Sequence, residues 1–114
     1  MANEDAAAAA DVLILTVPLQ AQSATLKTIK EHTKGKVLLD ATVPLETAIG
    51  GPVSNVLHIN PGSAAERAAN ILKDADVKVV AAFNNISNSH LANIPNPIEC
   101  DCLICGDDGK AKEI

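Results

Sequence analysis

Four short apolar runs divide the chain and predict its β-strands. They are Val12 to Val17, Lys36 to Ala41, Val77 to Phe83 and Cys100 to Cys105. Each run is shorter than an ordinary helix, and none alternates strictly between apolar and polar positions. This pattern is typical of strands that are covered on both faces, as in a parallel sheet.

Helical patterns fill the intervals between these runs. Asn3 is placed to cap a short helix that continues through Ala10. Leu19 to Lys34 carries apolar residues on one side, and Gly35 follows where a helix C-cap belongs. Ser63 and, three residues later, Glu66 form the capping-box pattern at the start of a third helix.

The alternation of strands and helices predicts a three-layer α/β fold with a parallel sheet and right-handed crossovers. The pattern predicts that the folded domain is incomplete at both ends of the chain. The run at Val12 to Val17 looks like a central strand, and Lys110 to Ile114 offers only one turn of a last helix. Either another chain or a missing half would then complete the sheet. The alternative is a compact four-stranded domain.

Charge and composition narrow the classes of function. The chain has 9 basic and 14 acidic residues and a net charge of −5, which argues against binding to nucleic acid or to an anionic membrane. Phe83 is the only aromatic residue, so no platform for stacking bases or sugars is expected. No basic segment precedes the alanine run at residues 6–10, so we expect no secretory signal and a cytoplasmic location with reduced cysteines.

Cys100, Cys102 and Cys105 form the most conspicuous cluster of reactive side chains. Thiolates at such a spacing can bind zinc or an iron–sulfur centre. On a strand, however, Cys105 would point away from the other two, and His58 or His90 would have to supply the missing ligand. We therefore interpret the cysteines as small apolar residues of a buried strand and predict no metal.

No motif predicts a catalytic group or a phosphate-binding loop. No two glycines have the spacing of G-x-G-x-x-G, and no serine lies in a G-x-S-x-G sequence. Gly106 to Lys110 has the wrong length for a P-loop, and its two carboxylates would repel a phosphate. Asp40, at the end of a strand, is the best-placed carboxyl group, and a role in a turn or a helix cap is favoured over catalysis.

The carboxyl ends of the strands remain as the candidate site, because ligands of open parallel sheets bind outside those ends. The ends read Thr16 to Pro18, Ala41 to Pro44 and Phe83 to Ile86. Their polar groups are small and neutral, which suits ribose hydroxyls, carboxamides and amide-like ring edges better than phosphate. The alternative is that these are ordinary loop starts, where Asn, Thr and Pro are common.

Six segments, in the same order along the chain, resemble one family. They are Asn3 to Ala6, the strand leading into Thr16 to Pro18, Val37 to Pro44, Gly62 to Glu66, Val80 to Ile86 and Cys105 to Asp108. Together they are similar to the NADP-dependent reductases of the deazaflavin coenzyme F-420, mostly archaeal proteins. The resemblance implies that residues 1–114 form one partial NAD(P)-binding, Rossmann-like domain with a doubly wound parallel sheet of about four strands and flanking helices. The N-terminal glycine-rich βαβ unit and the C-terminal helical segment would be missing.

The resemblance also implies which residues contact the cofactors, NADP and coenzyme F-420. The adenosine ribose would face Thr16, Val17 and Pro18. The nicotinamide and the deazaflavin would lie near Thr42, Val43 and Pro44. The two rings would meet at Asn84, Asn85 and Ile86, with the carboxamide near Asn88. Some relatives have His where Asn84 stands, so no proton-handling role is assigned to this position.

The activity implied by the resemblance is hydride transfer between nicotinamide C4 and deazaflavin C5. Such a step needs no side-chain acid or base, because the cofactors carry the chemistry. The protein would hold two flat rings in contact and exclude water. The alternative is a non-catalytic α/β module, and in either case a homo-oligomer or a partner chain could complete the sheet.

Overall fold

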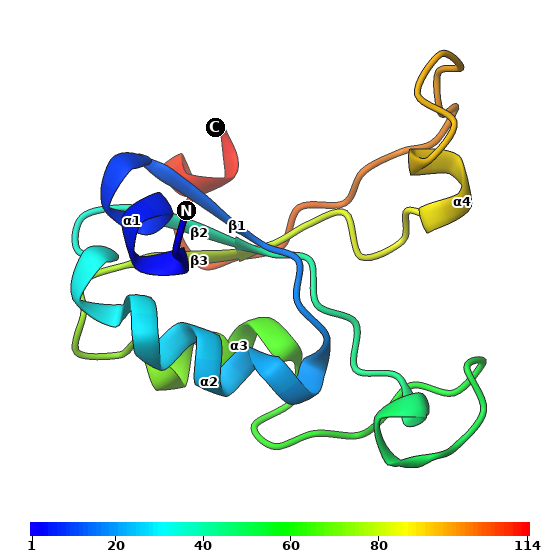
Figure 1. Ribbon diagram of the computed structural model, residues 1–114, viewed down its shortest axis with the longest axis horizontal. Coiled ribbons are helices and arrows are strands. Elements are labelled where there is room, and N and C mark those ends of the chain that lie inside the picture. Colours follow the sequence, from blue (N-terminus) through cyan, green and yellow to red (C-terminus); the bar gives the residue numbers. More distant parts are fainter.

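The chain forms a three-stranded parallel sheet with two helices packed against one face (Figure 1). The computed structural model describes all residues from 1 to 114. The strands are β1 (Val12–Leu15), β2 (Val37–Asp40) and β3 (Lys78–Ala81), and they lie in the order β1-β2-β3. This arrangement confirms the predicted α/β class and the parallel sheet.

The three strands are in register. Leu13 pairs with Leu38 and Leu38 with Val79, and the last residues Leu15, Asp40 and Ala81 pair in the same way. Because the strands are parallel and equally long, all three end at one edge of the sheet.

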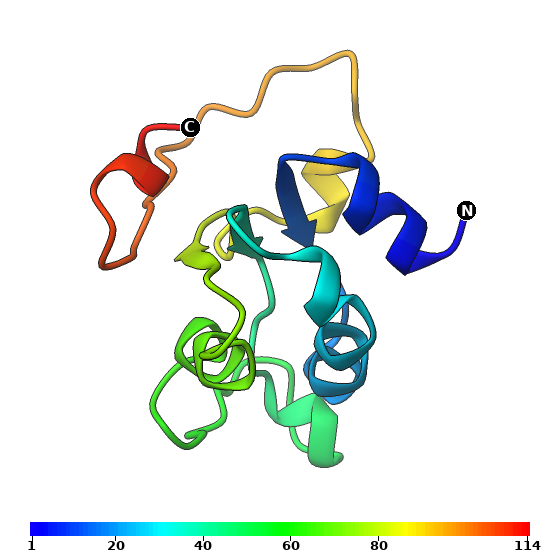
Figure 2. The ribbon, with the colours of Figure 1, turned by 90° about the vertical axis from the view of Figure 1, so that its left-hand side faces the viewer.

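The helical segments alternate with the strands as the sequence predicts. They are α1 (Asn3–Ala9), α2 (Leu19–Ile29), η1 (Lys30–His32), η2 (Glu46–Ile49), α3 (Ala64–Ile71), α4 (Asn88–Leu91) and η3 (Lys110–Lys112). In Figure 2, α2 and α3 lie side by side below the sheet. No helix combines the length and the apolar character that a membrane crossing demands.

The core lies between the sheet and these two helices. Its fully buried members include Leu38 of β2, Leu26 of α2 and Ala68 of α3, and Leu72 follows α3. Burying one such leucine contributes about 1.5–3 kcal/mol relative to leaving it in water. The apolar runs and the helix stripe therefore meet where the sequence pattern places them.

Local signals account for the ends of the helices. The Ser63 hydroxyl accepts a hydrogen bond from the Glu66 amide over 3.1 Å, which confirms the predicted cap of α3. Gly35 follows η1 with φ +72°, a conformation that favours glycine. The first helix differs from the prediction, because Ala2 occupies its N-cap position and Asn3 is its first helical residue.

The predicted fourth strand, Cys100 to Cys105, is wrong. Only Cys105 pairs with the sheet, in one isolated antiparallel bridge to Ala81 with N···O distances of 2.8 and 2.9 Å. The interpretation of the cysteines as buried is also wrong, because all three are exposed. Residues 100–104 approach β3 from outside the sheet and have no strand to pair with, so their apolar side chains stay in solvent.

Within this chain the strand β1 is an edge strand, because only β2 pairs with it. Ile14 is 60% exposed, whereas Leu13 and Leu15 on either side of it are buried against the core. The face of the sheet opposite α2 and α3 is covered mainly near β3, where η3 packs and Gly106 lies against Val80. The apolar run of β1 is thus covered on one face only.

Candidate cofactor-binding site at the strand ends

The ends of the three strands remain hydrogen-bonded to one another one residue past each strand. The amide of Ala41 donates to the carbonyl of Leu15 over 3.0 Å, and the amide of Ala82 donates to the carbonyl of Asp40 over 3.4 Å. The segments that follow therefore leave the sheet side by side, at the right-hand edge in Figure 1.

Two polar side chains then link these segments. The Thr42 hydroxyl donates to the carbonyl oxygen of Val17 over 3.3 Å. The Asn84 side-chain amide donates to the carbonyl oxygens of Thr42 over 3.2 Å and of Asp40 over 3.5 Å. The structure thus brings together three of the predicted residues, Val17, Thr42 and Asn84, one from each strand end. We call the group of predicted residues that follow the strands directly the strand-end site: Thr16, Val17, Pro18, Thr42, Val43, Pro44 and Asn84.

Exposure differs among the members of the strand-end site. Thr16, Pro18 and Asn84 are exposed, whereas Val17 is half-buried. Thr42 is only 3% exposed, because its hydroxyl is directed at the neighbouring strand end. Thr16 is therefore the threonine whose side chain is open to a ligand.

The remaining predicted residues lie on a separate excursion. Asn85 donates its side-chain amide to the carbonyl of Asp101 over 3.1 Å, and Asn88 is the exposed first residue of α4. Figure 1 shows α4 projecting away from the sheet. Asn85 and Ile86 line a cavity of about 570 Å³ together with His90. The structure therefore groups Asn85 and Ile86 with this cavity and does not bring Asn88 to the strand-end site.

Phe83, the first residue of the third predicted strand end, has a backbone conformation that the sequence pattern does not predict. It precedes Asn84, has φ +63° and is 42% exposed. A bulky residue in this left-handed conformation costs roughly 1–2 kcal/mol. The turn at Phe83 allows the Asn84 amide to reach back to β2. No sequence signal announces it, because Gly or Asn is the usual residue in such a turn.

The strand-end site carries no charged side chain, and the nearest carboxyl group is buried. Asp40 is 1% exposed, and its Oδ1 accepts a hydrogen bond from the Thr42 amide over 2.9 Å. This bond to the residue two positions ahead is the turn role predicted for Asp40. Its Oδ2 accepts from the Gln22 side chain over 2.7 Å.

Gln22 was missed by the sequence reasoning. It is fully buried, although glutamine is mostly found exposed. A signal was present, because Gln22 lies between Leu19 and Leu26 at helical spacing, on the apolar side of α2.

The other candidate chemistries lie elsewhere. No group of three or more His, Cys, Asp or Glu side chains is placed to hold a metal ion. In the segment that resembles a P-loop, Asp108 caps η3 by accepting the Ala111 amide over 3.0 Å. This hydrogen bond and the nearby Lys78 ammonium, 3.8 Å away, hold the pKa of Asp108 below its ordinary value of 3.8.

Comparison with known proteins gives one consistent picture. The family model described as NADP oxidoreductase, coenzyme F420-dependent, matches residues 1–44. The chain is 51% identical over 112 residues to the F420-dependent NADP reductase of Methanothermobacter thermautotrophicus. It is 54% identical to that of Methanothermobacter marburgensis and 43% identical to that of Methanocaldococcus jannaschii, also over 112 residues.

Solved structures agree on the fold. A crystal structure of a putative F420-dependent NADP reductase from Arthrobacter sp. FB24 superposes with a TM-score of 0.80 and 25% identity, over 99% of this chain and 51% of the other. A hypothetical protein from Sinorhizobium meliloti has a TM-score of 0.74 and 22% identity, over 96% and 50% of the two chains, which supports the fold alone.

The three reductases are matched over 98% of this chain and over 48–50% of their own length. The chain thus spans about half the length of these curated relatives. Over 112 of its 114 residues the chain is therefore similar, at 43–54% identity, to about half of each of three F420-dependent NADP reductases.

Proposed function

We propose that this chain is part of an oxidoreductase that transfers hydride between NADP(H) and the deazaflavin coenzyme F-420. The supporting observation is that the chain is 43–54% identical, over 98% of its length, to three proteins named F420-dependent NADP reductase. The uncharged strand-end site fits this activity. Stacked heterocycles need a flat, neutral surface with few hydrogen-bonding groups more than they need charge.

The proposed contacts follow the order of the strands. Thr16, Val17 and Pro18 would face the adenosine ribose. Thr42, Val43 and Pro44 would lie near the nicotinamide and the deazaflavin. Asn84, Asn85 and Ile86 would lie where the rings meet, with Asn88 near the carboxamide.

Two features of the described residues fit these cofactors. The side chains of Thr16 and Asn88 are exposed and make no hydrogen bond within the chain, so both can bind a hydroxyl or a carboxamide. The Asp40 carboxyl group is covered and faces inward to Gln22 and to the Thr42 amide. No exposed carboxylate of the strand-end site would therefore repel an electron-rich ring.

The two cofactors supply the reaction itself, which moves a hydride between nicotinamide C4 and deazaflavin C5. The part of this chain is to position the rings and to limit water. Val17, Val43 and Pro44 are half-buried apolar groups suited to the second task. No side chain of the strand-end site is placed to move a proton, and hydride transfer does not require one.

We also propose that residues 1–114 are one part of a Rossmann-like domain whose glycine-rich, pyrophosphate-binding unit lies outside this chain. Only 17 of the 114 residues are buried although 47% are hydrophobic, which leaves apolar surface for further structure to cover. One such surface is a hollow of about 290 Å³ beside the free edge of β1, lined by Ala6, Ala10 and Ile14. Further strands, a partner chain or a second subunit would pair there. The three exposed thiols fit a reducing location, and we propose the cytoplasm.

The activity is tested with the complete protein under anaerobic conditions. We expect oxidised coenzyme F-420 to lose its visible absorbance on addition of NADPH, and a flavin such as FMN to be a poor acceptor. Absence of turnover with F-420 in a folded protein would overturn the proposed activity.

The domain proposal has its own test. Calorimetry of NADPH with the 114-residue chain should detect little or no binding, because no glycine-rich helix N-terminus is present for the pyrophosphate. Tight binding by the 114-residue chain would contradict the domain proposal, whereas the proposed activity would still stand.

A further inference from the structure

A buried hydrogen-bonded pair lies next to the strand-end site. The Gln22 side-chain nitrogen donates to Asp40 Oδ2 over 2.7 Å, and the two residues are 0% and 1% exposed. Asp40 is the last residue of β2, and Gln22 is the fourth residue of α2. Carboxyl and amide groups are seldom so fully buried, because both lose their hydrogen bonds to water, and the protein must supply other partners.

The pair is connected to every strand end. Asp40 Oδ1 accepts the Thr42 amide over 2.9 Å. Thr42 in turn donates to Val17 after β1, and its carbonyl accepts from Asn84 after β3. One continuous set of hydrogen bonds therefore runs from Gln22 through Asp40 to all three segments of the strand-end site.

Gln22 also sets the start of α3. Its nitrogen donates a second hydrogen bond to the carbonyl oxygen of Ala64 over 2.9 Å. Because both acceptors lie on the nitrogen side, the amide has only one favourable orientation. A flipped amide would direct its oxygen at two other oxygens.

The arrangement carries a cost that core packing does not explain. The Gln22 side-chain oxygen is buried and has no hydrogen-bond partner. An apolar side chain of similar size would fill the space without an unpaired acceptor. The polar pair is thus better explained by the geometry that it imposes than by stability.

We propose that Asp40 and Gln22 are positioning residues, which fix the relative placement of the three loops that hold the redox rings. This inference rests on the proposed function. A shift of about 1 Å between reacting groups can cost about a hundredfold in rate, so a small movement of Thr42 relative to Val17 would reduce hydride transfer.

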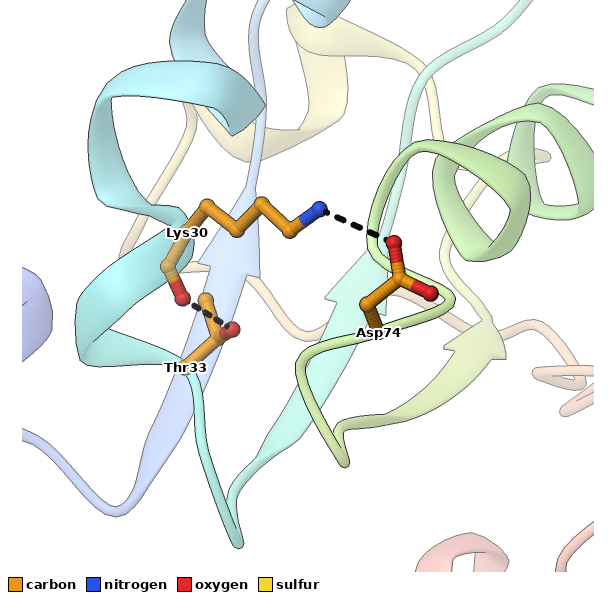
Figure 3. Close-up of polar contacts among 3 residues, drawn as sticks. All are labelled: Lys30, Thr33 and Asp74. Carbon is orange, nitrogen blue, oxygen red and sulfur yellow. Dashed lines mark hydrogen bonds and ion pairs between the residues drawn. The ribbon is translucent and has the colours of Figure 1, made fainter.

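The test compares four variants of the complete protein. Asp40→Ala removes both acceptors, and Asp40→Asn restores the acceptor for the Thr42 amide. Gln22→Met keeps the length of the side chain but removes its donor. The matched control is Thr33→Val, because Thr33 is fully buried and donates to the Lys30 carbonyl over 2.8 Å near the opposite edge of the sheet (Figure 3).

We expect Asp40→Ala to lower kcat about tenfold or more with a smaller change in the KM for NADPH, and Asp40→Asn to recover part of the loss. Gln22→Met should lower kcat, and the isotope effect with NADPH deuterated at the transferred position should become more temperature-dependent as ring placement loosens. Thr33→Val should keep the parent kcat. The proposal is overturned if Asp40→Asn and Gln22→Met keep the parent kcat and isotope effect, or if Thr33→Val loses as much activity as they do. If Asp40→Ala does not fold, Gln22→Met decides.

A second measurement separates this proposal from the proposed function. Amide hydrogen exchange at Thr42 and in the loop at Asn84 should become at least about tenfold faster in Asp40→Ala, and faster at Asn84 in Gln22→Met, than in the parent. If the parent shows no turnover with F-420 but these rates rise, the proposed function fails and the positioning role stands. If the protein turns over and the rates do not change, the positioning role fails alone.

Discussion

The side-chain amide of Asn84 donates to the carbonyl oxygen of Thr42 over 3.2 Å, so the loop after β3 is fastened to the end of β2. The same nitrogen lies 3.5 Å from the carbonyl oxygen of Asp40. Two backbone acceptors thus surround one donor. The strength of this contact therefore depends on whether the side chain at position 84 is charged and whether it can donate a hydrogen bond.

Asn84→Asp tests this relationship through its pH dependence. At pH 7 the ionised carboxylate would face two carbonyl oxygens, and we expect the free energy of unfolding to fall by about 1 kcal/mol. Repulsion raises the carboxyl pKa in the folded state, so the deficit grows as pH rises above about 4 and shrinks below it, where the protonated acid can donate to Thr42. Urea unfolding at pH 7 and at pH 3.5 measures both values.

The control for this variant is Asn88→Asp, at an exposed side chain that makes no hydrogen bond within the chain. It should show no comparable deficit at pH 7. Equal losses in the two variants would mean that the Asn84 contact contributes nothing.

Thr42→Val tests the link between β1 and β2. The substitution keeps the shape of a side chain that is 3% exposed and removes the donor to the Val17 carbonyl. We expect a loss of about 1 kcal/mol in the free energy of unfolding, because a poorly solvated carbonyl loses its partner. Thr42→Ser keeps the hydroxyl and should lose less. If Ser is the more damaging change in chemical denaturation, the methyl group and not the hydrogen bond stabilises this position.

Much of the fold follows from the pattern of the chain. The runs at Val12 and Val37 predict β1 and β2 because a continuous apolar stretch of that length fits a strand of a parallel sheet. The Ser63–Glu66 spacing predicts the start of α3 because it describes a local hydrogen bond. The same criterion failed for Cys100 to Cys105, since an apolar run becomes a strand only where a neighbouring strand offers a free edge over several residues. Only Cys105 finds such a partner.

In the candidate site, too, some contacts could be predicted from the sequence and others could not. Parallel register brings Val17, Thr42 and Asn84 together, and the sequence could predict this because consecutive strands of one sheet end at one edge. The buried contact between Gln22 and Asp40 could not be predicted, because it depends on how α2 is rotated against β2. The left-handed turn at Phe83 could not be predicted either, since tertiary contacts hold a residue there that would not choose that conformation.

The lowered pKa of Asp108 predicts that the C-terminal segment contributes less to stability in acid. Its pKa lies below 3.8 because the Ala111 amide donates to the charged form and Lys78 lies nearby. A lowered pKa means that its contribution to stability is present above about pH 3.8 and is lost as pH falls through the folded-state value. In Asp108→Asn this group no longer titrates, so the stability difference from the parent should narrow as the pH falls below 3.8. An NMR titration that places the carboxyl pKa at or above 3.8 would contradict the assigned contacts.

Two glycines in the last segment provide a matched pair of substitutions. A Cβ atom at Gly106 would lie 2.9 Å from Val80 Cγ1 and 3.2 Å from the Val79 carbonyl oxygen, whereas at Gly109 nothing lies within 4 Å. Val80 is buried in the sheet and cannot move away freely. Gly106→Ala should therefore reduce the free energy of unfolding by about 1–3 kcal/mol, as for an overpacked core.

Gly109 has φ −61° and ψ −42°, which alanine adopts readily. Gly109→Ala should be neutral or stabilise by about 0.4–1 kcal/mol, because alanine lowers the entropy of the unfolded chain. Thermal unfolding of the two variants side by side measures the difference. If Gly106→Ala is as stable as Gly109→Ala, residues 105–108 do not pack against β3, and the bridge between Ala81 and Cys105 does not hold this segment on the sheet.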